Sequence, residues 1–205
     1  MSHVIDLVLL TEVFVTLFVI MDPPGTIPVF LSLTSGRSAA TIRRAAWQAV
    51  MVSFFVITAF ALFGQGILHY LHISLPALQG AGGLLLLLVA LELLTGNEKE
   101  PTAAADVNVA LVPLGTPLLA GPGAIVATML FTRRVDSVAE FVAVALGIVL
   151  VHLCIWLAMR FSVRILKVIR ESGVVLVTRI AGLLLSAIAV QMVADAVRAF
   201  IAGRG

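Results

Sequence analysis

Two stretches decide how this 205-residue chain folds: Asp22-Pro23-Pro24-Gly25-Thr26-Ile27 and, 98 positions later, Ala120-Gly121-Pro122-Gly123-Ala124-Ile125. Each stretch places Pro-Gly inside a long apolar run. A helix that spans a membrane satisfies its own backbone hydrogen bonds, and proline and glycine interrupt that pattern. Two interrupted helices at corresponding positions of a chain are the usual sequence sign of the binding site in a secondary transporter.

The composition indicates an integral membrane protein. Hydrophobic residues make up 61% of the chain and charged residues 12%, and the mean hydropathy is +1.16. Soluble domains are about half apolar and a quarter charged. The net charge of +2 is small, and the basic residues are spread over interhelical segments, so no nucleic-acid partner is expected.

Apolar stretches of about 20 residues predict membrane spans. The six predicted spans are Ile5–Leu33, Ala46–Leu68, Leu75–Leu94, Val107–Phe131, Phe141–Met159 and Leu176–Ile201. An unbroken first span would be about 43 Å long, against about 30 Å of hydrocarbon. A break at residues 22–25 removes the excess length.

The basic residues set the predicted orientation. Nine of the 13 Lys and Arg side chains fall in or beside the segments after spans one, three and five, and four fall on the other side. The positive-inside rule therefore predicts that both termini are extracytoplasmic. We expect one multi-pass transmembrane domain over residues 1–205, with repeat one at about 1–95, a cytoplasmic linker at about 96–106 and repeat two at about 107–205.

The two halves align on each other. Pro24-Gly25 aligns with Pro122-Gly123 at an offset of 98 positions. At an offset of 99, Gly83 aligns with Gly182 and Ala90 with Ala189. Three spans per half is an odd number, so the repeat must be inverted in the membrane. The predicted fold is therefore an all-α membrane protein of six transmembrane helices, built as two inverted three-helix repeats whose helices 1 and 4 are broken at Pro-Gly.

The breaks predict a binding site. The first turn after each break, Gly25–Ile27 or Gly123–Ile125, has N–H groups without helical partners, while the preceding turns leave carbonyls free. Such a site suits a small zwitterion. The predicted substrate-binding residues are Asp22, Pro24, Gly25, Thr26, Ile27, Thr116, Gly121, Gly123, Ala124 and Ile125. The alternative interpretation is that both breaks are kinks repaired by Ser, Thr or water.

Two acidic residues are candidates for ion coupling. Asp22 has two compatible interpretations: it binds a substrate ammonium or the coupling proton, or it caps the following helix. Glu12 either lines an outer vestibule or points to the interface. His69 and His72 lack a third ligand, so no metal site is predicted. No cofactor is expected either, because no nucleotide-binding motif occurs.

The two motifs resemble those of the MarC family, also called the neutral amino acid transporter family. The resemblance rests on residues 22–30 (DPPGTIPVF) and 113–125 (PLGTPLLAGPGAI), and covers the whole chain in length and span number. It implies a transporter in the bacterial inner membrane for small neutral amino acids such as glycine and alanine. In at least some members it implies coupling to protons. The expected partners are thus a small zwitterionic substrate, a proton or other coupling ion, and membrane lipid.

Other function classes fit the sequence less well. A channel needs a continuous polar lining, which spans with few polar residues do not supply. An intramembrane enzyme needs a catalytic constellation, and neither H-E-x-x-H nor G-x-S-x-G occurs, so we expect no enzyme. Within transport, the main alternative is an exporter of other small or hydrophobic solutes without amino-acid specificity.

Overall fold

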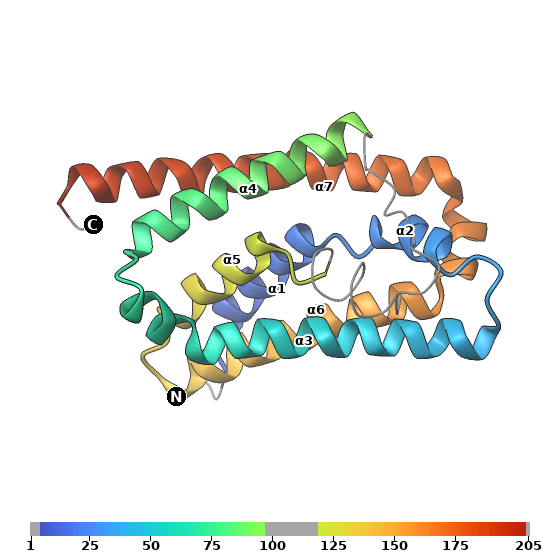
Figure 1. Cartoon of the computed structure of the whole chain (residues 1–205), viewed down its shortest axis with the longest axis horizontal. Helices are drawn as coiled ribbons and strands as arrows, with labels where there is room; N and C mark the ends of the chain where they lie inside the picture. Colours follow the sequence, from blue (N-terminus) through green and yellow to red (C-terminus); the bar gives the residue numbers. More distant parts are fainter. Residues whose placement is uncertain (1–4, 97–118, 204–205) are drawn as a thin grey trace.

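The computed structural model describes residues 5–96 and 119–203, and the only regular elements in those ranges are helices. Figure 1 labels them along the chain. They are α1 (Leu7–Met21), α2 (Thr26–Leu33), α3 (Ala39–Tyr70), α4 (Leu75–Thr95), α5 (Pro122–Thr132), α6 (Val138–Arg160) and α7 (Ser162–Ile201).

Local sequence explains where most of these helices start. The Asp6 carboxylate accepts hydrogen bonds from the N–H groups of Val8 and Leu9 at the start of α1. Ser38, Ser74 and Ser137 are the N-caps of α3, α4 and α6, and each side chain accepts a backbone N–H of its helix. These caps satisfy donors that the first helical turn leaves unpaired.

Four helical segments are long and apolar enough to cross a membrane: α3, α4, α6 and residues Ser172–Ile201 of α7. A fifth span results if α1 and α2 are counted together, because they pass the same test as a pair bent by 46°. The 11 residues of α5 reach only about 17 Å, too short to span alone. Residues 107–118 of the predicted span Val107–Phe131 and nearly all of the linker at 96–106 lie outside the described residues, so six spans remain a prediction.

Two helices are longer than the hydropathy pattern predicts. α3 starts at Ala39 instead of Ala46, directly after its Ser38 cap. α7 starts at Ser162 instead of Leu176, and its helical geometry is interrupted at Arg170, where φ is 62° and ψ is 165°. Both extensions are rich in basic residues. A window that measures hydropathy detects the hydrocarbon-spanning part of a helix and ignores turns that continue into the polar interface.

The helices form three tiers. Figure 1 shows α1, α2 and α5 between an α4–α7 pair and an α3–α6 pair, and the contacts between the helices agree. The main buried cluster joins α1, α2, α3, α5 and α6, with Leu17, Phe30 and Ile155 fully enclosed. A second cluster joins Leu86 of α4 and Leu185 of α7 to the middle tier. Hence α5 and α2 are the most enclosed of the described helices, with 7 of 11 and 4 of 8 residues buried.

Small residues bring α4 and α7 close together. A Cβ added at Gly83 would lie 2.9 Å from the Ala189 carbonyl oxygen, and one added at Gly182 would lie 3.2 Å from the Ala90 carbonyl oxygen. Neither position has room for a larger side chain, as is usual where membrane helices cross closely.

A polar contact joins the two helices of the other outer pair. The Ser53 hydroxyl of α3 lies 3.2 Å from His152 Nε2 of α6, and both side chains are buried. His152 Nδ1 is 2.7 Å from the Ile148 carbonyl oxygen, so both ring nitrogens have partners.

Candidate functional site

The first break separates α1 from α2 at residues 22–25. Asp22 has left-handed backbone geometry, with φ 40° and ψ 69°, which non-glycine residues rarely adopt. Its N–H donates to the Phe18 carbonyl at 3.1 Å and closes α1. Pro23 and Pro24 follow, and neither can donate a backbone hydrogen bond. The helix is therefore interrupted at the Pro-Pro-Gly sequence.

The prediction that Thr26 and Ile27 have unpaired N–H groups is wrong. The Thr26 N–H donates to the Asp22 carbonyl, and the Ile27 N–H to the Pro24 carbonyl, both at 3.1 Å. The Thr26 hydroxyl also donates to the Pro23 carbonyl at 2.7 Å. The break folds into a tight turn. The carbonyls of residues 22–24 therefore accept the hydrogen bonds that Thr26 and Ile27 donate.

The prediction that Asp22 caps the following helix is also wrong. The N-cap of α2 is Gly25, and no side chain caps it. Asp22 instead ends α1, and only 7% of its surface is exposed. Both carboxylate oxygens are buried without a hydrogen-bond partner in the described part of the chain. The side chain therefore does not cap α2.

Thr178 of α7 joins Asp22 in one polar cluster around Gly25. A Cβ added at Gly25 would overlap Asp22 Oδ2 and lie 3.2 Å from the Thr178 hydroxyl oxygen. That hydroxyl is also buried and without a partner among the residues described. We call Asp22, Gly25 and Thr178 the Asp22 cluster. A buried carboxylate without a partner is costly, so the cluster favours binding a proton, a cation or an ammonium group.

The second motif places the start of α5 in the core. Gly121 is the N-cap and Pro122 opens the helix. The Ile125 N–H donates to the Gly121 carbonyl at 3.2 Å, so the prediction of an unpaired N–H fails at Ile125. The N–H groups of Gly123 and Ala124 have no partner within residues 5–96 and 119–203. Two donors at a helix start remain for an anion.

A leucine covers the second motif. A Cβ added at Gly123 would overlap Leu86 Cδ2 of α4 and lie 2.6 Å from Leu86 Cγ. The second motif therefore has backbone donors and a neighbouring apolar side chain, whereas the first has a carboxylate and a hydroxyl. Residues beside both motifs, Met21 before the first and Ala120 and Ala124 in the second, belong to the same buried cluster.

The remaining candidates lie elsewhere. Glu12 is about half exposed and pairs with Arg134 at 3.1 Å. It is ten residues before Asp22, about 15 Å along α1, so it does not belong to the Asp22 cluster. Thr116 lies outside the described residues. Thr178 and Leu86, which neighbour the two motifs, were not among the residues predicted from the sequence. The only sign of Thr178 in the sequence is a lone threonine in an apolar span.

A separate groove of about 410 Å³ opens between α3 and α6. Phe54, Phe141 and Ile148 make it mainly apolar, and Thr58 and Gln65 add polar groups. None of the predicted site residues lines this groove.

The comparisons with known proteins agree on one family. The family model described as MarC family integral membrane protein matches residues 7–201. The chain is 38% identical to a UPF0056 membrane protein of Methanocaldococcus jannaschii, covering 90% of this chain and 94% of that protein. It is 35% identical to one of Aquifex aeolicus, covering 93% of each. It is 31% identical to YhcE of Escherichia coli, covering 93% of this chain and 92% of that protein. No solved structure matches.

Proposed function

This chain belongs to the MarC family of integral membrane proteins, and we propose that it is a secondary transporter of small neutral amino acids such as glycine and alanine. The names of its relatives give no substrate, so the proposal rests on the site. The observation that carries it is the Asp22 cluster, in which a buried carboxylate without a partner among the described residues lies at the break of a helix. Ionisable groups at membrane depth usually mark a transport pathway.

The two motifs supply opposite charges for a zwitterion. In this proposal the substrate ammonium binds the Asp22 carboxylate beside the Thr178 hydroxyl. The substrate carboxylate binds the N–H groups of Gly123 and Ala124, where the helix dipole adds positive potential. Small substrates are favoured because Gly25 and Gly123 are each crowded by a neighbouring side chain. Asp22 also carries the coupling proton, which leaves when the ammonium binds.

We further propose that the two halves form an inverted repeat. Gly83 and Gly182 are equivalent at an offset of 99, as are Ala90 and Ala189. Gly83 meets Ala189 while Gly182 meets Ala90, which is the reciprocal pattern that a two-fold axis produces. Ser53 and His152 are also 99 positions apart and contact each other, as equivalent residues on an axis would. These contacts support a pseudo-two-fold axis between the halves.

The proposed location is a bacterial inner membrane, with both termini extracytoplasmic. The supporting observation remains the basic residues, nine against four. Alkaline phosphatase fused after Gly205 should be active, and green fluorescent protein at the same place should be dark. The opposite pair of results would reverse the orientation.

Uptake into proteoliposomes tests the transport proposal. We expect labelled glycine to accumulate when a pH gradient is imposed, and to equilibrate without accumulation when an ionophore collapses that gradient. Unlabelled alanine should compete, and leucine should compete weakly because its side chain has no room beside Gly25 and Gly123. Absence of glycine uptake in vesicles that contain folded protein would refute the proposal.

The groove between α3 and α6 favours a second candidate, export of small hydrophobic solutes. It is apolar and open, and it is distinct from the Asp22 cluster. Thermal stabilisation of the purified protein separates the two functions, because a ligand of the folded state raises the melting temperature. Glycine should stabilise a transporter of amino acids. Stabilisation by apolar solutes alone, lost in Ala145→Phe, would favour the exporter.

A further inference from the structure

A basic pocket lies at the end of the molecule where α6 meets α7. Its volume is about 360 Å³, and it is enclosed by the first turns of α3, the last turn of α6 and the first turns of α7. Its lining includes four cationic side chains, Arg43, Arg160, Arg164 and Lys167, together with Phe161. None of the four forms an ion pair with a described carboxylate. An excess of positive charge in a cavity attracts an anion.

Two tryptophans beside this pocket indicate that it lies near the depth of lipid headgroups. Trp47 and Trp156, the only tryptophans of the chain, pack edge to face with ring centroids 6.3 Å apart. They lie one helical turn from Arg43 and Arg160, on the membrane side of the pocket. Tryptophan is enriched where hydrocarbon meets headgroups. The cations therefore lie just beyond the hydrocarbon edge.

Phe161 orders two of the cations. The guanidinium carbon of Arg160 lies 5.5 Å from the centre of the Phe161 ring, and that of Arg164 lies 5.7 Å from it. Two guanidinium groups held around one ring are pre-organised for a phosphate, which arginine binds through paired hydrogen bonds.

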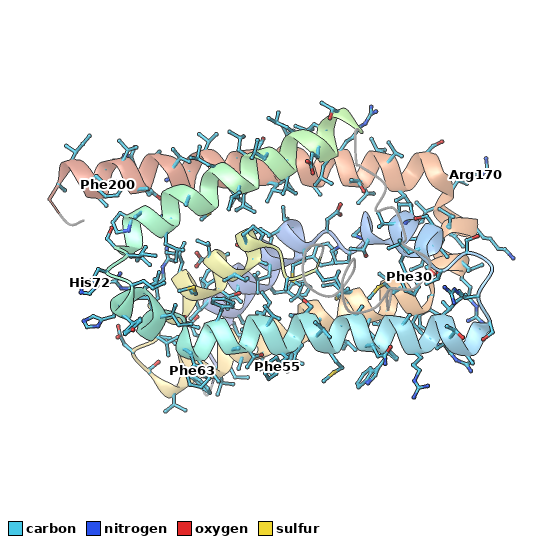
Figure 2. The ribbon with its side chains drawn as sticks, viewed as in Figure 1. Phe30, Phe55, Phe63, His72, Arg170 and Phe200 are labelled. Carbon is cyan, nitrogen blue, oxygen red and sulfur yellow. The ribbon has the colours of Figure 1, made fainter. Side chains whose placement is uncertain are left out.

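The first turns of α7 have exposed apolar side chains beside the pocket. This segment precedes the interruption at Arg170, outside the membrane-spanning residues Ser172–Ile201. Val163 is 52% exposed and Val168 is 82% exposed, while Arg164 and Lys167 line the pocket. Figure 2 places Arg170 at the opposite end of the molecule from His72 and Phe200. Exposed apolar side chains therefore alternate with the cations that line the pocket.

We propose that this basic pocket binds the phosphodiester headgroup of an anionic phospholipid, with the acyl chains lying along Val163 and Val168. The charge of the pocket, its depth at the tryptophans and the exposed apolar residues beside it match the three parts of such a lipid. Basic pockets between membrane helices recognise anionic headgroups in the same way. This site is separate from the Asp22 cluster and does not depend on the transported substrate.

The test compares lipids on the full-length protein in a neutral detergent. Phosphatidylglycerol should raise the melting temperature saturably, read from the fluorescence of Trp47 and Trp156, and 0.5 M NaCl should weaken the effect. Phosphatidylcholine and inorganic phosphate should give no comparable shift. Equal stabilisation by phosphatidylcholine would overturn the headgroup preference, and equal stabilisation by inorganic phosphate would overturn the lipid assignment.

Variants locate the site. Arg160→Gln with Arg164→Gln should weaken phosphatidylglycerol binding about 30-fold, measured by native mass spectrometry, at the usual surface contribution of two basic residues. Arg133→Gln with Arg198→Gln removes the same charge from the end of α5 and the last turn of α7 and should change affinity less than two-fold. Equal losses in both pairs would overturn the pocket. Should the first pair misfold, Phe161→Leu keeps every charge and should still lower affinity several-fold; unchanged affinity would contradict the proposal.

Discussion

The two Pro-Gly motifs are similar in sequence and differ in their surroundings. At the first, the backbone donors of Thr26 and Ile27 are paired within the turn, and the groups left unpaired among the described residues are the Asp22 carboxylate and the Thr178 hydroxyl. At the second, the N–H groups of Gly123 and Ala124 are unpaired in the described part of the chain, and Leu86 packs against Gly123.

The difference teaches that a repeated motif need not repeat its chemistry. Position 120, which corresponds to Asp22, is alanine, so the second motif has no charge of its own. In the proposed site the first motif would act through a side chain and the second through backbone N–H groups and the helix dipole. A substrate with one charge of each sign can use both, whereas a substrate with a single charge can use only one.

The largest expected effect comes from Asp22→Asn. Asparagine keeps the size and hydrogen-bonding capacity of aspartate and removes its charge. Breaking a buried charge pair costs about 2–5 kcal/mol, so glycine uptake should fall at least ten-fold and lose its response to the pH gradient. Asp195→Asn, an exposed aspartate of α7, is the matched control and should transport normally. If Asp22→Asn took up glycine normally and still responded to the pH gradient, the charge of Asp22 would not account for a functional difference between the motifs.

Alanine at the two motif glycines should separate their roles. In Gly25→Ala the new methyl group overlaps Asp22 Oδ2, so the carboxylate must move and uptake should fall about ten-fold. In Gly123→Ala the methyl group overlaps Leu86 Cδ2 and lies 2.6 Å from Leu86 Cγ, so the atoms that must shift belong to an uncharged side chain. That variant should keep most of its uptake.

Leu86→Ala supplies the control for this pair. Combined with Gly123→Ala it should restore whatever activity the single variant loses, because it removes the overlapping atoms. It should not rescue Gly25→Ala. If uptake fell equally in Gly25→Ala and Gly123→Ala, and Leu86→Ala restored neither, the two motifs would have the same role.

The sequence predicted the position of the first break, because proline and glycine act locally. It did not predict that the Asp22 carboxylate is buried without a hydrogen-bond partner among the described residues. The surroundings of that carboxylate depend on Thr178, 156 positions away, and on packing of α7 that no local pattern encodes. The paired N–H groups of Thr26 and Ile27 were missed because Pro-Pro-Gly permits both an open break and a tight turn.

The helix boundaries show the same limit. Hydropathy located every span that lies in the described residues, because burial in hydrocarbon requires apolar side chains. It did not predict the interfacial turns at Ala39 and Ser162, where basic and apolar residues alternate. Residues of those turns line the basic pocket, so the hydropathy pattern did not identify the residues on which the lipid proposal rests.

A smaller effect is expected where the two halves cross. In Gly83→Ala the new methyl group would lie 2.8 Å from Val193 Cγ2 and 2.9 Å from the Ala189 carbonyl oxygen, which is backbone and cannot turn aside. Overpacking of this kind costs about 1–3 kcal/mol. Gly80→Ala, on the same helix, would place its methyl group 3.4 Å from Ala196 Cβ, an ordinary contact.

The melting temperatures of these two variants measure the difference. Gly83→Ala should melt several degrees lower than the parent protein, and Gly80→Ala within about a degree of it. If the pseudo-two-fold axis holds, Gly182→Ala should behave like Gly83→Ala, because the Ala90 carbonyl oxygen lies 3.2 Å from its new methyl group. A neutral Gly182→Ala would argue against equivalent halves.

The smallest effect should follow Glu12→Gln, which tests whether the first half has a second coupling carboxylate. Glu12 lies about 15 Å along α1 from Asp22, and its ion pair with Arg134 is exposed to solvent. Exposed pairs contribute less than about 1 kcal/mol, so the melting temperature should change little. Glycine uptake and its dependence on the pH gradient should also stay at the parent level. If Glu12→Gln abolished the response to the pH gradient while Asp22→Asn kept it, the proton would travel through the outer end of α1. The contrast between the two motifs would then concern substrate binding alone.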